Sequence, residues 1–469
     1  MKKTPVNKNI VLALLAMTMF LVVLDSAIIN VALPAIKKAL HFDVASLQWV
    51  LTAYILTFGG FLMLGGRAAD LYGRRRVLVM GMAGFLLFSL LIGLSNSSTI
   101  LIVLRALQGL SAAFMAPTAL SILLTTFDEG PERNRALSIW SIVASGGAAA
   151  GVFLGGVLTQ YLGWEWCFFV NVPIGLITLF CILKYIPPQA KEAKDKNLDI
   201  PGAVLVTGGL MSLVYALTLA SQSGWTADET VRAFAISIVM LAAFIWNEAK
   251  VKHPLMPLSI FRLRNVVGGN LIMLPIVAGA LGQFFFLSLY VQNVLHYSPV
   301  LSGMAFLPVP VIIGIVSYQS PKLLNKFGFK PLVIAGTGLA ALGVFGISLL
   351  GTNSSYWTQL LPPFLVLAVG FGISFVAITV AATSDVPSDE SGLAAGLINT
   401  AQQIGGALGL AVLAVVANTA TLAAQQAGKN QAESLVAGYH QAFLTAAMLM
   451  VVALLIAIFV IRTPKITKK

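Results

Sequence analysis

The sequence predicts an all-α, polytopic membrane protein with fourteen transmembrane helices, arranged as two six-helix bundles plus two inserted helices. Three observations support this fold class: an apolar composition, fourteen long apolar runs, and a weak resemblance between the first and last parts of the chain. Of the 469 residues, 58% are hydrophobic and only 10% are charged, whereas about 25% of the residues of an ordinary soluble protein are charged. The composition therefore excludes a soluble enzyme, a nucleic-acid-binding protein and a disordered chain.

The apolar runs have the length of membrane-spanning helices, which need about 20 mainly apolar residues. The eighth run is the shortest. The first run has a basic start but no small-residue cleavage site, so we expect a retained helix and not a signal peptide. The fourteen predicted spans are Ile10–Leu33, Leu47–Ala68, Val77–Leu94, Thr99–Leu124, Ala136–Tyr161, Trp166–Ile186, Ile200–Ala220, Ala233–Glu248, Val266–Val294, Leu301–Tyr318, Pro331–Leu350, Trp357–Thr383, Leu393–Asn418 and Ala442–Ile461.

The distribution of basic residues predicts the orientation in the membrane. The net charge is +12, and twenty-four of the 29 Lys and Arg residues fall on the side of the two termini. Only Lys37, Lys38, Arg232 and Lys429 fall on the other side. Because an excess of Lys and Arg marks cytoplasmic loops, we expect a multi-pass protein of the plasma membrane with both termini in the cytoplasm. We attribute the excess of basic residues to this orientation and not to nucleic-acid binding.

An internal repeat at an offset of 255 residues predicts the domain organisation. Residues 67–75 and 322–330 share a basic start, a polar fourth position, an aromatic-Gly pair and a basic end, and Asp43 aligns with Ser298. Two basic loops would also match by chance, but the spacing agrees at two separate places. Parallel duplicated halves are typical of transporters with a midplane substrate site. The predicted parts are an N-terminal six-helix bundle (1–190), a two-helix insert (191–262) and a C-terminal six-helix bundle (263–469).

Two charged residues inside predicted spans are the main candidates for chemistry. Asp25 is the only one of the seventeen acids that falls well inside a span, and Arg105 is the only such base. At 1.5 Å per residue they lie about 12 and 9 Å from the outer ends of their spans. An intramembrane charge is costly and therefore indicates a functional site. We predict that Asp25 binds and releases a proton under the influence of Arg105; the alternative is a static ion pair that fixes helix packing.

Glycines recur every four residues in the fifth predicted span, at Gly147, Gly151 and Gly155, and Gly156 follows. This spacing predicts a flat groove along which a neighbouring helix can approach and slide. Ordinary close packing explains the same glycines equally well.

The loop from Gly65 to Arg76 is more specific. Asp70, Gly73 and three consecutive arginines beginning at Arg74 predict a tight cytoplasmic turn. The Asp70 carboxylate would cap a helix end, or it would pair with a base of the other half and hold the two halves together. A basic anchor alone would explain the arginines but not Asp70 or Gly73.

Uncharged polar residues inside the spans form a third group. They would either line a substrate cavity or bond one helix to another. The four histidines are scattered and predict no metal site, and no catalytic constellation occurs, so we expect neither an enzyme nor a cofactor. The candidate cavity residues are Asn30, Gln108, Gln283, Asn399, Gln402 and Gln403.

Four motifs resemble the fourteen-helix drug:proton antiporter branch of the major facilitator superfamily. Leu24–Pro34 is similar to its first-helix signature, Gly66–Arg76 to the loop motif between helices two and three, Leu104–Gly109 to the fourth-helix motif with its arginine, and Gly147–Gly156 to the fifth-helix antiporter motif. The resemblance covers the whole chain.

The resemblance implies roles for these residues. Asp25 and Arg105 would serve proton coupling, Asp70 and Arg74 would join Asp128 in a charge network that closes the cytoplasmic side, and the glycines would permit rocking of the halves. Two positions depart from the family pattern. Val152 stands where proline usually follows the central glycine, and Glu165 stands where arginine is usual between two tryptophans.

These observations predict a proton-coupled antiporter that exports lipophilic, cationic drugs by alternating access, with the proton gradient as its energy source. The expected partners are the lipid bilayer, a small amphipathic substrate and protons. A dedicated exporter of an endogenous metabolite, lipid or peptide, and a proton-coupled uptake symporter, are alternatives within the same fold. A membrane-embedded enzyme would need clustered catalytic residues, and a sensor or scaffold would not need Asp25.

Overall fold

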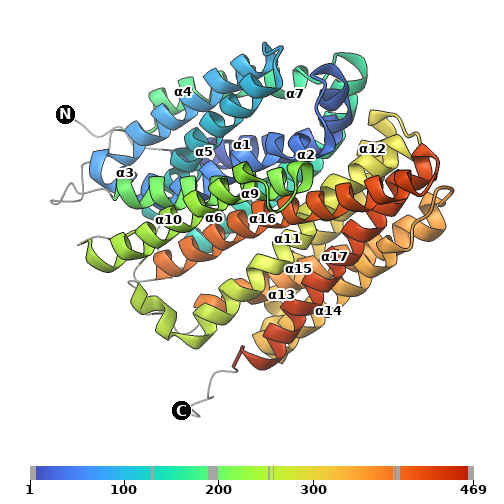
Figure 1. The fold of residues 1–469 in the computed structure, drawn as a ribbon. Helices are drawn as coiled ribbons and strands as arrows, with labels where there is room; N and C mark the ends of the chain where they lie inside the picture. The colour runs from blue at the N-terminus through green and yellow to red at the C-terminus, as the bar shows by residue number, and fades with distance from the viewer. Residues whose placement is uncertain are drawn as a thin grey trace.

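The computed structural model describes residues 7–127, 131–187, 199–251, 254–256, 258–383, 386 and 391–462. These residues are mostly helical, and no strand occurs among them, which confirms the all-α prediction. Figure 1 shows long helices that run side by side, with both chain termini at one end of the molecule. We call this the terminal end and the other the opposite end.

Thirteen segments within the described part of the chain are long and apolar enough to cross a membrane, and each coincides with a predicted span. The fifth predicted span corresponds to α6 (Pro131–Tyr161), a continuous helix of 31 residues, several of whose side chains lie outside the described residues. The multi-pass membrane protein is therefore confirmed, while the count of fourteen crossings stays a prediction.

The N-terminal set of helices, α1 to α8, packs around α1 and α5. Helix α1 lies against α6, α5 and α8, while α5 lies against α3 and α4. The sixth predicted span is divided into two helices, α7 and α8. The bounds are α1 (Lys8–Ala39), α2 (Val44–Leu47), α3 (Trp49–Tyr72), α4 (Arg74–Gly93), α5 (Ser98–Thr126), α6 as above, α7 (Trp166–Phe169) and α8 (Asn171–Tyr185).

The C-terminal set, α11 to α17, packs around α11 and α17. Helix α11 lies against α15, α16 and α17, and α14 lies against α15 and α17. The tenth predicted span is divided into α12 and α13, and the twelfth begins with one turn of π-helix, η2. The bounds are α11 (Arg264–Asn293), α12 (Pro299–Phe306), α13 (Pro308–Phe327), α14 (Phe329–Ser348), η2 (Tyr356–Leu360), α15 (Leu361–Thr383), α16 (Ser391–Gln426) and α17 (Gln431–Phe459).

The two sets contact each other along two main interfaces, which we call seams. Helix α6 packs against α12 and α13, and α3 packs against α16. The insert consists of α9 (Ile200–Ser223) and α10 (Asp228–Lys250), and the 3₁₀ turn η1 (Leu258–Arg262) follows it. Because α9 lies against both α3 and α16, it covers the second seam. Helix α10 packs on α9 and leaves apolar side chains such as Ile238 and Val239 exposed, as expected of a surface that faces lipid.

The local structure agrees at the two places where the sequence resembles itself. Gly73 joins α3 to α4 with φ 95°, and Gly328 joins α13 to α14 with φ 75°, a left-handed conformation that glycine adopts without steric cost. Asp43 caps the start of α2, and Ser298 caps the start of α12. Both pairs are separated by the same 255 residues.

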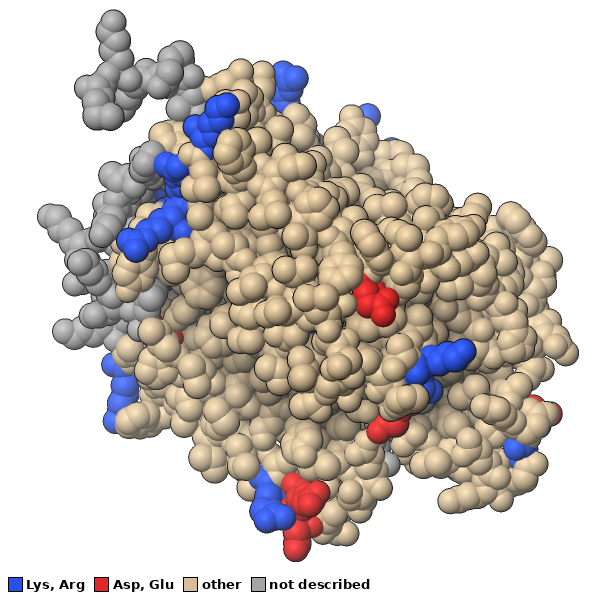
Figure 2. Space-filling model, turned by 90° about the horizontal axis from the view of Figure 1, so that it is seen from above, with Lys and Arg blue, Asp and Glu red and all other residues tan. Residues whose placement is uncertain are grey.

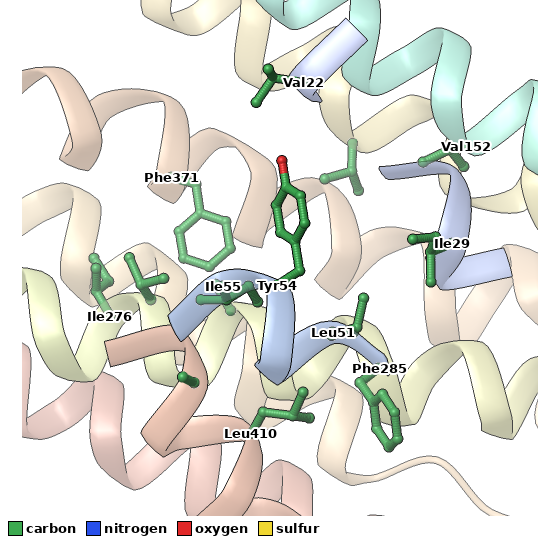
Figure 3. Close-up of a cluster of buried hydrophobic side chains, with 14 of the residues drawn as sticks. Val22, Ile29, Leu51, Tyr54, Ile55, Val152, Ile276, Phe285, Phe371 and Leu410 are labelled. Carbon is green, nitrogen blue, oxygen red and sulfur yellow. The ribbon is translucent and has the colours of Figure 1, made fainter. Parts of the chain in front are cut away.

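The apolar core is continuous across both sets. Figure 3 shows Tyr54 of α3 and Val152 of α6 in one cluster with Phe285 of α11, Phe371 of α15 and Leu410 of α16. On the outside, Figure 2 shows Lys and Arg gathered at the left of the view and a broad area without charged side chains beside them. Such an uncharged belt is what a bilayer requires.

Candidate functional site

The two intramembrane charges, Asp25 and Arg105, form an ion pair. Arg105 Nη1 lies 2.7 Å from Asp25 Oδ2, and both residues are fully buried. A second ion pair, Lys8 with Glu132, is solvent-exposed. A buried pair of this kind is strongly destabilised when one partner is removed, because the other charge stays buried and uncompensated.

The second oxygen of Asp25 is bound by two amides. Gln108 Nε2 and Asn171 Nδ2 each donate to Asp25 Oδ1 at 2.9 Å. Gln108 also donates to Ser89 Oγ at 2.7 Å and accepts from Arg105 at 2.6 Å. The carboxyl group of Asp25 thus accepts from three side chains, which matches an ionised carboxylate because that group can only accept.

Arg105 is enclosed by aromatic rings and backbone. Its guanidinium carbon lies 4.4 Å from the ring centre of Tyr54 and 5.8 Å from that of Phe168, and its Nε donates to the carbonyl of Val50 at 2.9 Å. Aromatic faces stabilise a cation that has been taken out of water. The Asp25 site is therefore built from six helices, α1, α3, α4, α5, α7 and α8, and is closed to water.

The sequence did not identify Asn171, Ser89 or Tyr54 as site residues. Single uncharged polar residues in apolar spans occur for many reasons, so nothing marked these three. Asn171 carried the best available signal, since it is an amide at the start of an otherwise apolar helix. Two buried atoms of the site, Asn171 Oδ1 and the Tyr54 hydroxyl, have no hydrogen-bond partner.

The glycine row of α6 lies against the helix that carries Asp25. A methyl carbon added at Gly151 would come within 2.7 Å of Ala27 Cβ, and one at Gly155 within 2.5 Å of the Ile28 carbonyl oxygen. Gly147 faces Phe20, which also lies on α1. Helices α1 and α6 therefore approach more closely than any larger side chain would allow.

Gly156 points to the other set of helices. A carbon added there would meet the carbonyl oxygen of Pro299 at 2.5 Å, and one at Gly303 of α12 would meet the carbonyl oxygen of Val152 at 2.7 Å. This reciprocal glycine contact forms the α6–α12 seam near the opposite end. Helix α6 thus touches the Asp25 helix on one side and the C-terminal set on the other.

The opposite end is also closed by hydrogen bonds between α11 and α1. Ser288 Oγ donates to the carbonyl of Asn30, and Gln292 Nε2 donates to the carbonyl of Val31 at 3.0 Å. Pro34 lies inside α1 and has no N–H, so it cannot donate to the carbonyl of Asn30 four residues earlier. The proline therefore leaves a backbone acceptor free for the other set of helices.

The predicted cytoplasmic gate is only partly visible. Gly73 forms the turn between α3 and α4, and Arg74 begins α4. Asp70 lies in the last turn of α3, but its side chain lies outside the described residues, as does Asp128 as a whole. The proposed charge network of this gate stays a prediction.

The predicted cavity residues lie at different places. Gln108 belongs to the Asp25 site, whereas Asn30 donates to the carbonyls of its own helix at Ser26 and Ala27. Gln283 is fully buried on α11, and neither atom of its amide has a partner. On α16, Gln402 and Gln403 are half-buried and Asn399 is exposed. The six residues lie on four helices, α1, α5, α11 and α16, and their role as cavity residues stays a prediction.

A multi-pass helical protein with two sets of helices, two seams and a buried carboxylate–arginine pair defines a membrane transporter embedded in the lipid bilayer. The family comparison specifies it further. Residues 15–410 match the model of the Major Facilitator Superfamily, and the chain therefore belongs to that superfamily. It is a transporter and not an enzyme.

Several similar proteins are named as resistance or export proteins. The puromycin resistance protein of Streptomyces alboniger is 42% identical over 409 residues, which cover 86% of this chain and 80% of that protein. The cephamycin export protein of Amycolatopsis lactamdurans is 41% identical over 405 residues, which cover 86% of this chain and 83% of that protein.

The solved structures show the fold alone. A peptide transporter of the POT family, PepTSo, superimposes with a TM-score of 0.72 at 16% identity and covers 97% of this chain and 98% of its own. The xylose transporter XylE from E. coli, in a partially occluded inward-open conformation, gives a TM-score of 0.61 at 14% identity and covers 96% of this chain and 98% of its own.

Proposed function

We propose that this protein is a proton-coupled antiporter of the plasma membrane that exports lipophilic, cationic drugs by alternating access. Its terminal end faces the cytoplasm in this proposal, in agreement with the excess of Lys and Arg on that side. The names of the similar proteins support export of antibiotics. The proton gradient supplies the energy, and no cofactor takes part.

One observation carries the proposal: the proton-binding candidate and the contacts that close the opposite end lie on the same helix. Asp25 and Asn30 are five residues apart on α1, or about 7.5 Å at 1.5 Å per residue. Helix α1 can move along α6 because the glycine row leaves no side chain between them. A displacement at Asp25 is therefore transmitted directly to the carbonyls held by Ser288 and Gln292.

The proposed cycle starts with the opposite end closed and Asp25 ionised. A substrate cation that enters from the cytoplasm displaces the Asp25 carboxylate from Arg105, helix α1 shifts, the contacts with α11 break and the opposite end opens. A proton from outside then binds Asp25, whose neutral carboxyl group no longer holds the cation, so the substrate leaves and the opposite end closes. Release of the proton to the cytoplasm restores the match of the carboxylate with Arg105, Gln108 and Asn171, three donors aimed at a carboxylate.

The substrate class follows from the charge balance of the site. A single unduplicated carboxylate suits a compound with one positive charge, which would compete with the proton. Buried polar groups without partners, the Tyr54 hydroxyl and the Gln283 amide, together with the phenylalanines of α11 and α15, suit the amphipathic remainder of such a compound.

The test is transport in reconstituted vesicles with an imposed proton gradient and an internal pH dye. Wild type is compared with Asp25→Asn, and with Glu229→Gln as the control, because Glu229 is an exposed acid of the insert. Lipophilic cations and puromycin are added in turn. We expect substrate-triggered proton movement in wild type and control and none in Asp25→Asn. Movement that survives Asp25→Asn would contradict the assigned proton site.

A dedicated exporter of one antibiotic is the second candidate function. The names of the puromycin resistance protein and the cephamycin export protein favour it, because each names one compound or class. The same vesicle assay separates the two functions. Proton movement with many unrelated cations supports a multidrug antiporter, whereas movement with a single compound supports the dedicated exporter.

A further inference from the structure

The insert contains two buried acids that take no part in the Asp25 site. Asp199 immediately precedes α9, and Glu248 lies near the end of α10, so both are at the terminal end. Their residues are 5% and 4% exposed, respectively. Two carboxyl groups buried this deeply need hydrogen-bond donors or a counter-charge to offset the loss of water.

Both carboxyl oxygens of Asp199 accept hydrogen bonds. Its Oδ1 accepts from the backbone N–H of Gly202 and from Asn247 Nδ2, both at 2.9 Å, and Asn247 Nδ2 also lies 2.8 Å from Oδ2. The first of these bonds caps α9, and the second ties the end of α10 to the start of α9. Asp199 therefore fixes the two inserted helices to each other.

Glu248 has one bonded and one free oxygen. Its Oε2 accepts from the backbone N–H of Met256 at 2.7 Å, whereas its Oε1 is buried and has no hydrogen-bond partner among the described residues. A carbon added at Gly202 would clash with Asp199 Oδ2 and would come within 2.8 Å of Glu248 Oε1. The free oxygen of Glu248 and the carboxylate of Asp199 therefore face the same small space.

Among the described residues, no Lys or Arg makes an ion pair with this pair of acids. Lys250 lies exposed with its amino group 4.3 Å from the ring centre of Trp246. Within the part of the chain that the structure describes, neither Lys250 nor Arg67 nor Arg262 makes an ion pair with either acid, and the charge that acts on Glu248 is that of Asp199. Two like charges this close cannot both be ionised without a large cost, so one carboxyl group holds a proton.

We propose that Asp199 and Glu248 form a second proton-binding site, in which one proton on Glu248 Oε1 is shared with the carboxylate of Asp199. A metal ion fits less well, because hydrogen bonds already occupy Asp199 and Glu248 Oε2, and a cation needs several oxygens. The proton binds to the Glu248 carboxylate, which becomes a carboxylic acid and donates to Asp199. This site does not depend on the antiport mechanism or on its substrate.

The site connects the insert to the α3–α16 seam. Met256, whose N–H is bound by Glu248, packs in an apolar cluster with Met63 of α3, Leu263, and Ala394 and Leu397 of α16. Loss of the shared proton would place two negative charges side by side. Their repulsion would displace the Glu248 carboxylate from the N–H of Met256. The insert thus makes the terminal end of the seam sensitive to proton binding.

Infrared spectroscopy of the purified full-length protein tests the proposal. We would record the C=O stretching band of protonated carboxyl groups near neutral pH in an Asp25→Asn background, which removes the other intramembrane acid. We expect the band to be present there and in the further variant Glu229→Gln, and to be lost in both Glu248→Gln and Asp199→Asn. A band that persists unchanged in both variants, or that is absent throughout, would overturn the proposal.

Thermal unfolding across pH provides a second measurement that does not require a particular band. Glu248→Gln keeps the shape and a donor for Asp199 but cannot ionise. Wild type should lose stability as the pH rises through the loss of the shared proton, whereas Glu248→Gln should lose less. Equal pH dependence of the two proteins, or stabilisation of wild type by added Mn²⁺ that Glu248→Gln abolishes, would contradict a shared proton.

Discussion

The two sets of helices differ in what they bury. The N-terminal set encloses a charged network, in which Asp25 and Arg105 pair with each other, two amides donate to Asp25, and one of these amides also donates to a hydroxyl. The C-terminal set encloses aromatic rings, with Phe284, Phe306 and Phe364 in mutual contact at centroid distances of 5.7 to 6.3 Å. Two sets with the same local turns thus have different interiors.

Two halves with the same fold therefore do not need the same kinds of buried side chains. A buried ion pair is specific, because each partner is costly without the other. Aromatic packing is non-directional by comparison and tolerates many shapes. We therefore expect the N-terminal set to carry the charge change and the C-terminal set to provide an adaptable apolar surface. Five substitutions test this contrast, the first four in order from the largest expected effect to the smallest.

The largest effect is expected for Arg105→Ala. It leaves the Asp25 carboxylate buried without its cation, which costs about 3–5 kcal/mol of the free energy of unfolding. Thermal or denaturant unfolding in detergent measures this loss. The double variant Asp25→Asn, Arg105→Ala should recover part of it, because the uncompensated charge is gone. A double variant no more stable than Arg105→Ala would break the contrast between the two sets.

A smaller effect is expected for Phe364→Ala, which removes the ring contacts with Phe284 and Phe306. The loss should stay below the about 3–5 kcal/mol typical of water-soluble cores, because in lipid the unfolded chain already keeps the ring out of water. It should also be the same at mildly acidic and neutral pH. Phe345→Ala on α14, which is half exposed on the apolar surface, is the control and should have little effect.

Asn171→Ala should cost about 1–2 kcal/mol, since it removes one of the three side-chain donors to Asp25 and such interhelical bonds are modest in lipid. Thr178→Ala on the same helix is the matched control, because the Thr178 hydroxyl donates only within α8. We also expect slower substrate-triggered proton movement in Asn171→Ala but not in the control. Equal behaviour of both variants would show that Asn171 only fills space.

The smallest effect is expected for Ser288→Ala, which removes one hydrogen bond between the two sets. An interhelical bond in a membrane averages about 0.6 kcal/mol, so the population with the opposite end open should rise by roughly threefold. Distances between spin labels across that end measure the population. Ser320→Ala is the control, because Ser320 bonds only within the C-terminal set.

Pro34→Ala sharpens the same test. It restores an N–H that can bond to the carbonyl of Asn30 within α1, so the bond from Ser288 to that carbonyl must compete with a helix bond while the serine itself stays. The opposite end should open as it does in Ser288→Ala. An unchanged distance distribution in both variants would mean that the bond from Ser288 to Asn30 does not hold that end closed.

The sequence by itself determined the fold class and the two central charges. Runs of about 20 apolar residues favour membrane-spanning helices, because a helix satisfies its own backbone hydrogen-bonding groups in lipid. Asp25 and Arg105 were recognisable because a charge inside a span is costly and therefore rare. The glycine row was recognisable for a similar reason, since its period of four places all members on one face.

Only the tertiary structure decided which polar groups meet. Ser89, Asn171 and Tyr54 lie on different helices from Asp25, and nothing local distinguishes them from other polar residues in apolar spans. Asp199 and Glu248 fall at the ends of their helices, where acids are usually solvated, and their burial follows from the packing of α9 on α3 and α16. Helix length and apolarity are properties of a segment and can be read from it, whereas a hydrogen bond between helices depends on rotation and depth that only packing fixes.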